Sequence, residues 1–281
     1  MIANQFDYAA PATLAEALGL LADGSAKPLS GGMSLIPMMK LRLANPERLI
    51  DIGRLTELNY IREDKEQIHV GAGATHYDIE TAPLLRAKCP LLAETAGHIG
   101  DIQVRNMGTI GGSVAHADPA ADYPAALQAL EAKIVLKSAS GERTLAVADF
   151  FLDTFTTALE SGEIVSEIIV PVDDASTGSS YQKFVQPASG FAIVGVAARI
   201  RRKGGKVTMA RIGVTGLAGH SYRASNAEKA LEAGKDAASA AASIPDGAEA
   251  NSDLHASADY RRHMASNYGA RAIAAALSRS A

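Results

Sequence analysis

Two short glycine segments constrain this chain of 281 residues more than any other feature. The first glycine segment is Ser30-Gly31-Gly32-Met33-Ser34, and the second glycine segment is Thr109-Ile110-Gly111-Gly112-Ser113. Each joins a hydrophobic run to a small hydroxyl residue. A Gly-Gly pair lets the backbone adopt positive φ and approach a ligand closely, so successive N–H groups can converge on an anion such as a pyrophosphate. Together the two segments predict a phosphate group held from both sides.

Other short motifs exclude several common chemistries. Gly204-Gly205 is a pair of the kind that merely forms a turn. The stretch Gly71-Ala72-Gly73-Ala74-Thr75-His76 lacks the third glycine of the G-x-G-x-x-G dinucleotide fingerprint. Neither G-x-x-x-x-G-K-[ST] nor G-x-S-x-G occurs, so nucleotide hydrolysis and serine hydrolase chemistry have no anchor in this chain.

Composition narrows the class of partner and cofactor. With 47% hydrophobic and 21% charged residues the chain has the composition of a globular protein. Its net charge of -4 does not indicate the positively charged surface that binds nucleic acid. Aromatic residues make up 5% and tryptophan is absent, which argues against a base-stacking platform. Cys89 is the only cysteine, whereas an iron–sulfur cluster needs several thiolates. Any such cluster is therefore expected on another chain.

The sequence predicts a cytoplasmic protein without a metal site. No run approaches the roughly 18 apolar residues of a membrane span, and Asn4 and Asp7 stand where a signal peptide would carry basic residues. The seven histidines, among them His76 and His116, show no H-x-x-x-H spacing.

Hydrophobic spacing predicts mixed helices and strands in the first part of the chain. Pro90 interrupts a helical pattern there, and the stretch from Ile99 to Asp118 is rich in glycine with little periodicity. That stretch is expected to form a long ordered loop, which inside a domain is commonly functional. Helices or turns are expected at 11–22, 35–43, 81–97 and 120–131, and strands at 27–29, 48–52, 67–72, 133–137 and 164–170.

A polar, small-residue stretch from Asp173 to Ser180 predicts a linker and a domain boundary. Beyond it, three antiparallel strands are expected, with the basic cluster Arg199 to Lys206 as a solvated hairpin, and helices follow. Strands grouped before helices predict an α+β C-terminal domain. The expected strands are 181–186, 192–201 and 207–214, and the expected helices are 225–233, 235–243 and 256–278.

Two carboxylates follow the second glycine segment and flank a short proline turn. Asp118 is equally well explained as the N-cap of the next helix. Asp122 is the better functional candidate, because a carboxylate beside a phosphate-binding loop can accept hydrogen bonds from ribose or ribityl hydroxyls.

Several strings resemble, in their order and spacing, the FAD-binding medium subunit of molybdenum hydroxylases, the carbon monoxide dehydrogenase medium-subunit or xanthine dehydrogenase FAD-subunit family. They are SGGMSLIPMMKLRLANPERLIDI, GAGATH, IGDIQVRNMGTIGGSVAHADPAADYPAAL, EIVSEIIVP and YQKF. The resemblance spans nearly the whole chain. It implies an α+β fold: a PCMH-type (vanillyl-alcohol-oxidase-like) FAD-binding domain at 1–173, with α/β subdomains at about 1–55 and 56–173. A smaller α+β C-terminal domain, a three-stranded antiparallel sheet with helices, would occupy 178–281.

The resemblance also implies a set of residues that bind FAD without a covalent link. Residues 28–35 would wrap the pyrophosphate and residues 109–113 would close over it from the other side. Lys183 would reach the isoalloxazine, where a cation stabilises negative charge on the reduced flavin; the alternative for Lys183 is a solvated strand lysine. The implied set is Pro28, Leu29, Ser30, Gly31, Gly32, Met33, Ser34, Leu35, Thr75, His76, Ile99, Gly100, Thr109, Ile110, Gly111, Gly112, Ser113, Asp122, Val165, Ser166, Lys183 and Phe191.

Some positions depart from the commoner pattern of that family. Ser30 stands where Ala is usual, Met33 where Gln, His or Thr is frequent, and Ser113 in place of Asn. None of these changes removes a backbone donor. Pro187 stands where many relatives have Arg, so no side-chain contact of that kind is expected there.

Functionally, the resemblance implies an electron-transfer subunit with no catalytic residue of its own. A large subunit would carry molybdopterin, a small subunit would carry two [2Fe–2S] clusters, and the complex would be a dimer of heterotrimers. Two alternatives are a non-catalytic assembly subunit and a stand-alone flavin oxidoreductase of the same fold. The substrate, whether carbon monoxide, an aldehyde or an N-heterocycle, would be selected on another polypeptide.

Overall fold

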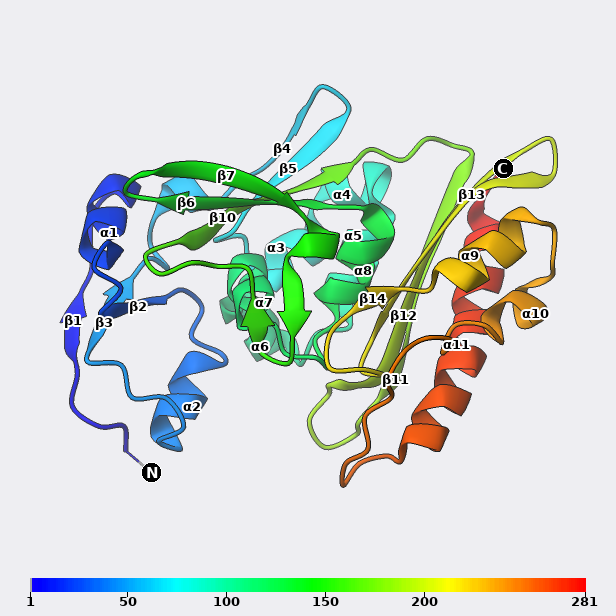
Figure 1. The fold of residues 1–281 in the computed structure, drawn as a ribbon. Helices are drawn as coiled ribbons and strands as arrows, with labels where there is room; N and C mark the ends of the chain where they lie inside the picture. Colours follow the sequence, from blue (N-terminus) through cyan, green and yellow to red (C-terminus); the bar gives the residue numbers. More distant parts are fainter. Residues whose placement is uncertain (1) are drawn as a thin grey trace.

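The computed structural model describes residues 2–281, arranged as three larger sheets that follow one another across the molecule (Figure 1). The N-terminal sheet is parallel, with strand order β1 (Asp7–Ala9), β3 (Arg48–Asp51), β2 (Ala26–Leu29). Helix α1 (Leu14–Leu21) packs on it through its apolar face, and Thr13 caps the helix by accepting from the Glu16 N–H. The first glycine segment leaves this sheet directly after β2 and leads into α2 (Leu35–Lys40).

The middle sheet is antiparallel and supports most of the remaining helices. Its strand order is β4 (Ile61–Asp64), β5 (Gln67–Gly71), β10 (Ile164–Pro171), β6 (Lys133–Ser138), β7 (Gly141–Ala146). The largest hydrophobic core lies between this sheet and its helices. Those helices are α3 (His76–Thr81), α4 (Pro83–Lys88), α5 (Pro90–Gly97), α6 (Ile102–Met107), α7 (Ile110–His116) and α8 (Tyr123–Leu130). Two 3₁₀ turns (Thr56–Leu58, Val147–Asp149) and a small hairpin, β8 (Phe151–Asp153) with β9 (Thr156–Thr157), complete this part.

The C-terminal sheet is also antiparallel, in the order β11 (Thr177–Val185), β12 (Ala192–Lys203), β13 (Lys206–Thr215), β14 (Tyr222–Arg223). Helix α11 (Ala258–Arg279) covers one face against β11 and β12, while α8 packs on β12 and β13. Residues 192–200 of β12 are accordingly all buried. Helix α10 (Ala237–Ala241) packs on α11, while α9 (Ser225–Glu232) packs on β13 and α10 (Figure 1). The predicted three strands are present, and the short β14 adds a fourth.

The prediction of a long loop over 99–118 is wrong, because this stretch contains α6 and α7. Asp101 caps α6 by accepting from the Val104 N–H, and Thr109 caps α7 by accepting from the Gly112 N–H. Each helix has fewer than eight residues, too few to show a helical period in the sequence. The glycines inside α7 conceal it further, because glycine is a poor helix former.

Two predictions about the start of the C-terminal part are also wrong. The supposed linker ends early, because residues 177–180 are buried and pair with 198–201 as the first half of β11. Gly178 serves packing there, since a Cβ would overlap the Ala276 carbonyl oxygen of α11. Arg199 is not part of a solvated hairpin: it is buried and forms an ion pair with Asp173 at 2.7 Å. The division into folding units at residues 173–178 stays a prediction.

Within residues 2–281, no helix is both long and apolar enough to cross a membrane.

Candidate cofactor site

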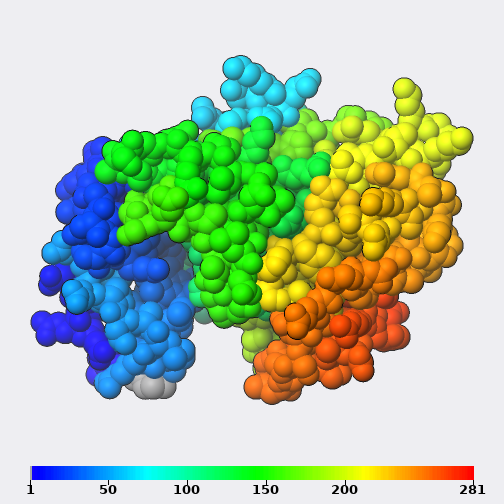
Figure 2. All heavy atoms as spheres, in the orientation of Figure 1, coloured from blue at the N-terminus to red at the C-terminus, as the bar shows by residue number. Residues whose placement is uncertain are grey.

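A cavity of about 890 Å³ lies where the N-terminal sheet meets the middle of the molecule. Figure 2 shows the hollow between the blue N-terminal part and the green middle part. The walls comprise the first glycine segment, the second apart from Ile110, residues 155–157 and 159–165, and the tip of the β11–β12 hairpin at 189–191. Pockets for small molecules and cofactors usually measure about 300–1,000 Å³, so the cavity has the size of a cofactor site.

The two glycine segments are in direct contact on one wall of this cavity. The Ser30 and Thr109 hydroxyls are 3.0 Å apart, within hydrogen-bonding distance. A Cβ on Gly31 would overlap the Met107 carbonyl oxygen just before the second segment. The absence of a side chain at Gly31 therefore lets the segments close on one another.

The second glycine segment uses its own N–H groups to attach to the end of β5. Ile110 N–H donates to the Ala74 carbonyl at 3.1 Å, and Gly111 N–H donates to the Ala72 carbonyl at 2.9 Å. A Cβ on Gly111 would overlap Ala72, so this glycine is needed for packing inside the protein. The Gly112 N–H is taken by the Thr109 cap.

The first glycine segment, in contrast, leaves its donors free. Among the described residues, the N–H groups of residues 31–35 donate to no protein acceptor. Gly32 has φ +72°, the left-handed conformation that curls successive N–H groups into a concave anion-binding nest. The hydroxyl-bearing residues Ser34 and Ser113 line the same cavity. These groups fit a pyrophosphate, which offers several negatively charged acceptors at one point.

His76 contributes a neutral imidazole to the wall. Its side chain is buried, its Nδ1 lies 3.2 Å from the Tyr123 hydroxyl, and its Nε2 lies against Gly108. Burial, reinforced by the nearby charge of Arg105, lowers the pKa of His76 to about 4. Among the described residues, no group of three or more His, Cys, Asp or Glu is placed to hold a metal ion.

This histidine gives a pH dependence of stability that can be measured. Between about pH 6.5 and pH 4 the unfolded chain binds a proton at His76 that the folded chain does not, because the folded-state pKa is depressed. We expect acidification across this window to lower the free energy of unfolding by about 3 kcal/mol through this residue. Urea unfolding at several pH values gives the free energy of unfolding as a function of pH. Across this window that free energy should fall less steeply on acidification in His76→Gln than in wild type. The exposed His255→Gln serves as control, and a His76→Gln profile identical to wild type would contradict the assignment.

Asp122 faces the cavity from the start of α8 and is fixed by two residues of β11. Its carboxylate accepts from the Tyr181 hydroxyl at 2.5 Å and from the Lys183 ammonium at 2.9 Å. Lys183 donates also to the His98 carbonyl, and its side chain is only 2% exposed. The alternative of a solvated strand lysine is therefore wrong. Lys183 does not itself line the cavity; it contacts Asp122, which does.

Most of the other residues in the predicted set also line the cavity, including Ile99, Gly100, Val165 and Phe191 and the whole of 28–35. Three further residues of the set do not line the cavity and contact other parts of the protein instead. Thr75 caps α3 with Asp78, Ile110 is fully buried in the core, and Ser166 donates to the Val135 carbonyl. The roles of individual residues toward the cofactor stay predictions.

Sequence reasoning missed the wall formed by residues 155–164. Phe155 in this wall has φ +52°, unusual for a bulky residue, and its ring lies 5.1 Å from that of His116. Gly162, with φ +79°, turns the chain back beside Leu21 and Ala22. No motif marks these residues, because a tertiary contact positions them: the Phe155 N–H donates to the carbonyl of Ala117, which directly follows α7.

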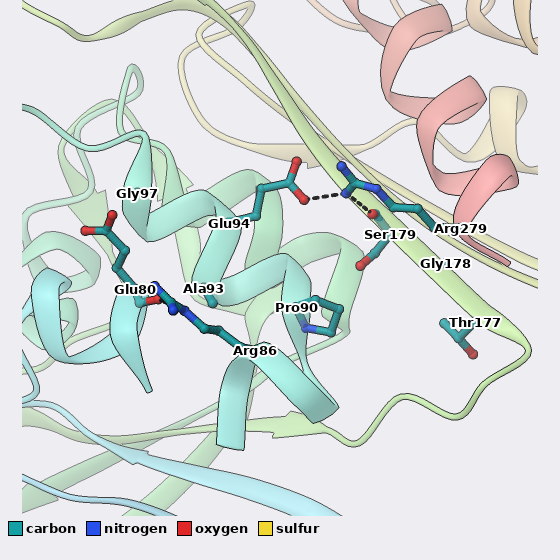
Figure 3. A pocket seen from close by; sticks show the side chains of 10 residues that line it. All are labelled: Glu80, Arg86, Pro90, Ala93, Glu94, Gly97, Thr177, Gly178, Ser179 and Arg279. Atoms are coloured by element: carbon teal, nitrogen blue, oxygen red, sulfur yellow. Dashed lines mark hydrogen bonds and ion pairs between the residues drawn. The ribbon is translucent and has the colours of Figure 1, made fainter. Parts of the chain in front are cut away.

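A second, smaller cavity of about 490 Å³ lies between α5 and β11. Its charged side chains are engaged with protein partners. Arg279 donates to the Glu94 carboxylate at 2.6 Å and also to the Ser179 carbonyl; Figure 3 marks both contacts with dashed lines. Arg86 donates to the Glu80 carbonyl. The larger cavity, with its free backbone donors, is therefore the candidate cofactor site.

The free N–H groups at 31–35 in a cavity of this size, without a Rossmann motif, are typical of a cofactor-binding protein. Comparison with known proteins identifies the cofactor. Residues 4–173 match the family "FAD binding domain in molybdopterin dehydrogenase", and residues 179–276 match "CO dehydrogenase flavoprotein C-terminal domain". The chain belongs to this family of FAD-binding medium subunits of molybdenum hydroxylases. The predictions of family, fold class and FAD are thereby confirmed.

Individual relatives cover the chain at high similarity. The carbon monoxide dehydrogenase medium chain of Hydrogenophaga pseudoflava is 42% identical over 290 residues, covering 100% of both chains. The glyceraldehyde dehydrogenase medium chain of Sulfolobus acidocaldarius is 41% identical over 230 residues, 82% of each. A solved carbon monoxide dehydrogenase from Hydrogenophaga pseudoflava that lacks the Mo-pyranopterin moiety superposes with a TM-score of 0.96 at 43% identity, covering 100% of both chains.

Proposed function

We propose that this chain is the electron-transferring FAD subunit of a heteromeric molybdenum hydroxylase. It takes electrons from a [2Fe–2S] partner subunit and passes them to an external acceptor. The observation that carries the proposal is the row of free N–H groups at 31–35 in a cofactor-sized cavity. Membership of the FAD-binding family supplies the identity of the ligand.

Within this function the chain's residues bind and orient the cofactor. The N–H groups of 31–35 hold the pyrophosphate, with the hydroxyls of Ser34 and Ser113 beside them. Thr109 fixes the second glycine segment against the first through its contact with Ser30. The remaining acceptor sites of the Asp122 carboxylate take hydroxyls of the cofactor. FAD supplies the redox chemistry when bound, and the protein positions it and excludes water.

The attachment is non-covalent, and the other redox groups lie on partner chains. Cys89 is fully buried, its pKa is raised to about 12 by burial, and it does not line the cavity. This single thiol cannot build an iron–sulfur cluster. Relatives are named as medium chains or as subunits of dehydrogenase complexes. We propose a small [2Fe–2S] subunit and a large molybdopterin subunit as partners, assembled as a dimer of heterotrimers in the cytoplasm.

The function is tested on the purified complex with carbon monoxide, an aldehyde and an N-heterocycle offered in turn as substrate. We expect flavin absorbance to bleach with the substrate that the complex oxidises. The matched control is a complex carrying Gly31→Ala, in which the iron–sulfur absorbance should still bleach while electron delivery to a dye acceptor stops. A fully loaded complex that turns over while its flavin stays oxidised would refute the proposal. Protein that stays colourless after FAD reconstitution would indicate an assembly subunit, and a chain that purifies alone with flavin activity would indicate a stand-alone oxidoreductase.

A further inference from the structure

We propose that Tyr181 is a positioning residue for FAD that acts through Asp122. A strand of the C-terminal sheet thereby controls the orientation and ionisation of a carboxylate in the cofactor cavity. The inference rests on the proposed function in one respect, the contact between Asp122 and the cofactor.

The geometry links β11 to the cavity through two side chains on one face of the strand. Tyr181 and Lys183 are two residues apart, and this spacing places both on the same side. The Tyr181 hydroxyl donates to Oδ1 of Asp122 and the Lys183 ammonium to Oδ2, so each carboxylate oxygen has one partner from β11. A carboxylate has about four acceptor sites. Those left over are available to a ligand in the cavity that Asp122 lines.

The surroundings of Tyr181 accommodate its hydroxyl specifically. The side chain is fully buried, and its ring packs edge-on against the His98 ring, with the two ring centroids 5.7 Å apart. Gly195 on the neighbouring strand β12 carries no side chain, and a Cβ there would overlap the Tyr181 hydroxyl oxygen. The hydroxyl therefore has space in front of it and one strong acceptor, the Asp122 carboxylate.

The charge state of Asp122 depends on these two partners. Burial raises the pKa of Asp122, while Lys183 and the Tyr181 hydroxyl act in the opposite direction by stabilising the carboxylate. The other titratable groups that face it are His98, at the end of α5, and Tyr123, beside it on α8. Removing the Tyr181 hydroxyl leaves Oδ1 without its donor. The carboxylate is then free to turn and is protonated at a higher pH.

The test measures FAD affinity of the full chain as a function of pH, from the change in flavin fluorescence on binding. We expect the affinity to fall on acidification as Asp122 is protonated, and Tyr181→Phe to move the midpoint of that fall upward by about one to two pH units. At a pH between the two midpoints, the reduction potential of bound flavin should become more positive, because a nearby negative charge has been neutralised. A purely structural role for Tyr181 would move neither quantity.

Tyr60→Phe is the matched control. The Tyr60 hydroxyl also donates to a carboxylate, Glu167 at 2.6 Å, but neither residue lines the cavity. We expect the wild-type midpoint in this control. If Tyr181→Phe does not fold, 3-fluorotyrosine at position 181 retains the hydroxyl as a stronger donor and should lower the midpoint.

The outcomes separate this inference from the proposed function. Wild-type protein that binds no FAD would overturn the proposed function itself. Normal FAD binding with the same pH midpoint in Tyr181→Phe as in wild type would overturn only the role of Tyr181. An Asp122→Asn variant with wild-type affinity at every pH would overturn it too, because the carboxylate through which Tyr181 acts would then be irrelevant.

Discussion

Gly31→Ala should lower the affinity for FAD by at least about 100-fold, because the loss of one or two charge-assisted hydrogen bonds from the cradle is of that size. The new Cβ would overlap the Met107 carbonyl oxygen, a backbone atom that cannot turn aside. The first glycine segment must therefore move away from the second. The Ser30–Thr109 contact and the convergence of the N–H groups at 31–35 are lost with this movement.

The affinity is measured by titrating the FAD-free chain with FAD and following flavin fluorescence. Gly178→Ala is the control, because its Cβ would likewise overlap a backbone carbonyl, that of Ala276, at a position outside the cavity. This control should lose thermal stability but bind FAD with wild-type affinity. If both variants bind FAD equally well, the pyrophosphate does not lie in this cradle.

Arg199→Met should lower the free energy of unfolding by about 3–5 kcal/mol, the usual loss when one partner of a buried ion pair is removed. Arg199 on β12 and Asp173, just after β10, lie 2.7 Å apart with side chains that are each 5% exposed. The second oxygen of Asp173 has no hydrogen-bond partner among the described residues. Without Arg199, a buried carboxylate is left uncompensated between the middle sheet and the C-terminal sheet.

Urea unfolding at neutral pH measures this loss. Arg262→Met is the control, because Arg262 forms an exposed ion pair with Asp259, and such pairs contribute about 0–1 kcal/mol. The double variant Arg199→Met, Asp173→Leu should recover much of the stability, since it removes the isolated charge as well. A change in Arg199→Met as small as that in the control would show that Asp173 is neutral or hydrated in the folded protein.

Elements that are specified by residues close together in the sequence were predicted well, and elements that depend on short caps or on distant contacts were missed. The C-terminal strands and helices agree with prediction to within a few residues, because each carries its own apolar pattern. Helices α6 and α7 were missed because they are short and rely on the caps Asp101 and Thr109. The first half of β11 was missed because polar residues at 177–180 are buried only once α5 and α11 pack beside them.

The sequence by itself predicted an anion site at the two glycine segments, and its motif order identified the FAD-binding family. Only the tertiary structure decided which of the two glycine segments keeps its N–H groups available for a ligand. The N–H groups of Ile110 and Gly111 in the second segment donate to the carbonyls of Ala74 and Ala72, just after β5, and Gly111 is a packing residue. Within residues 2–281, the first segment meets no such partner and keeps its donors free. The same holds for Lys183, whose burial against Asp122 depends on a contact between distant parts of the chain. Local sequence sets which groups can donate, and long-range packing sets which of them remain available to a ligand.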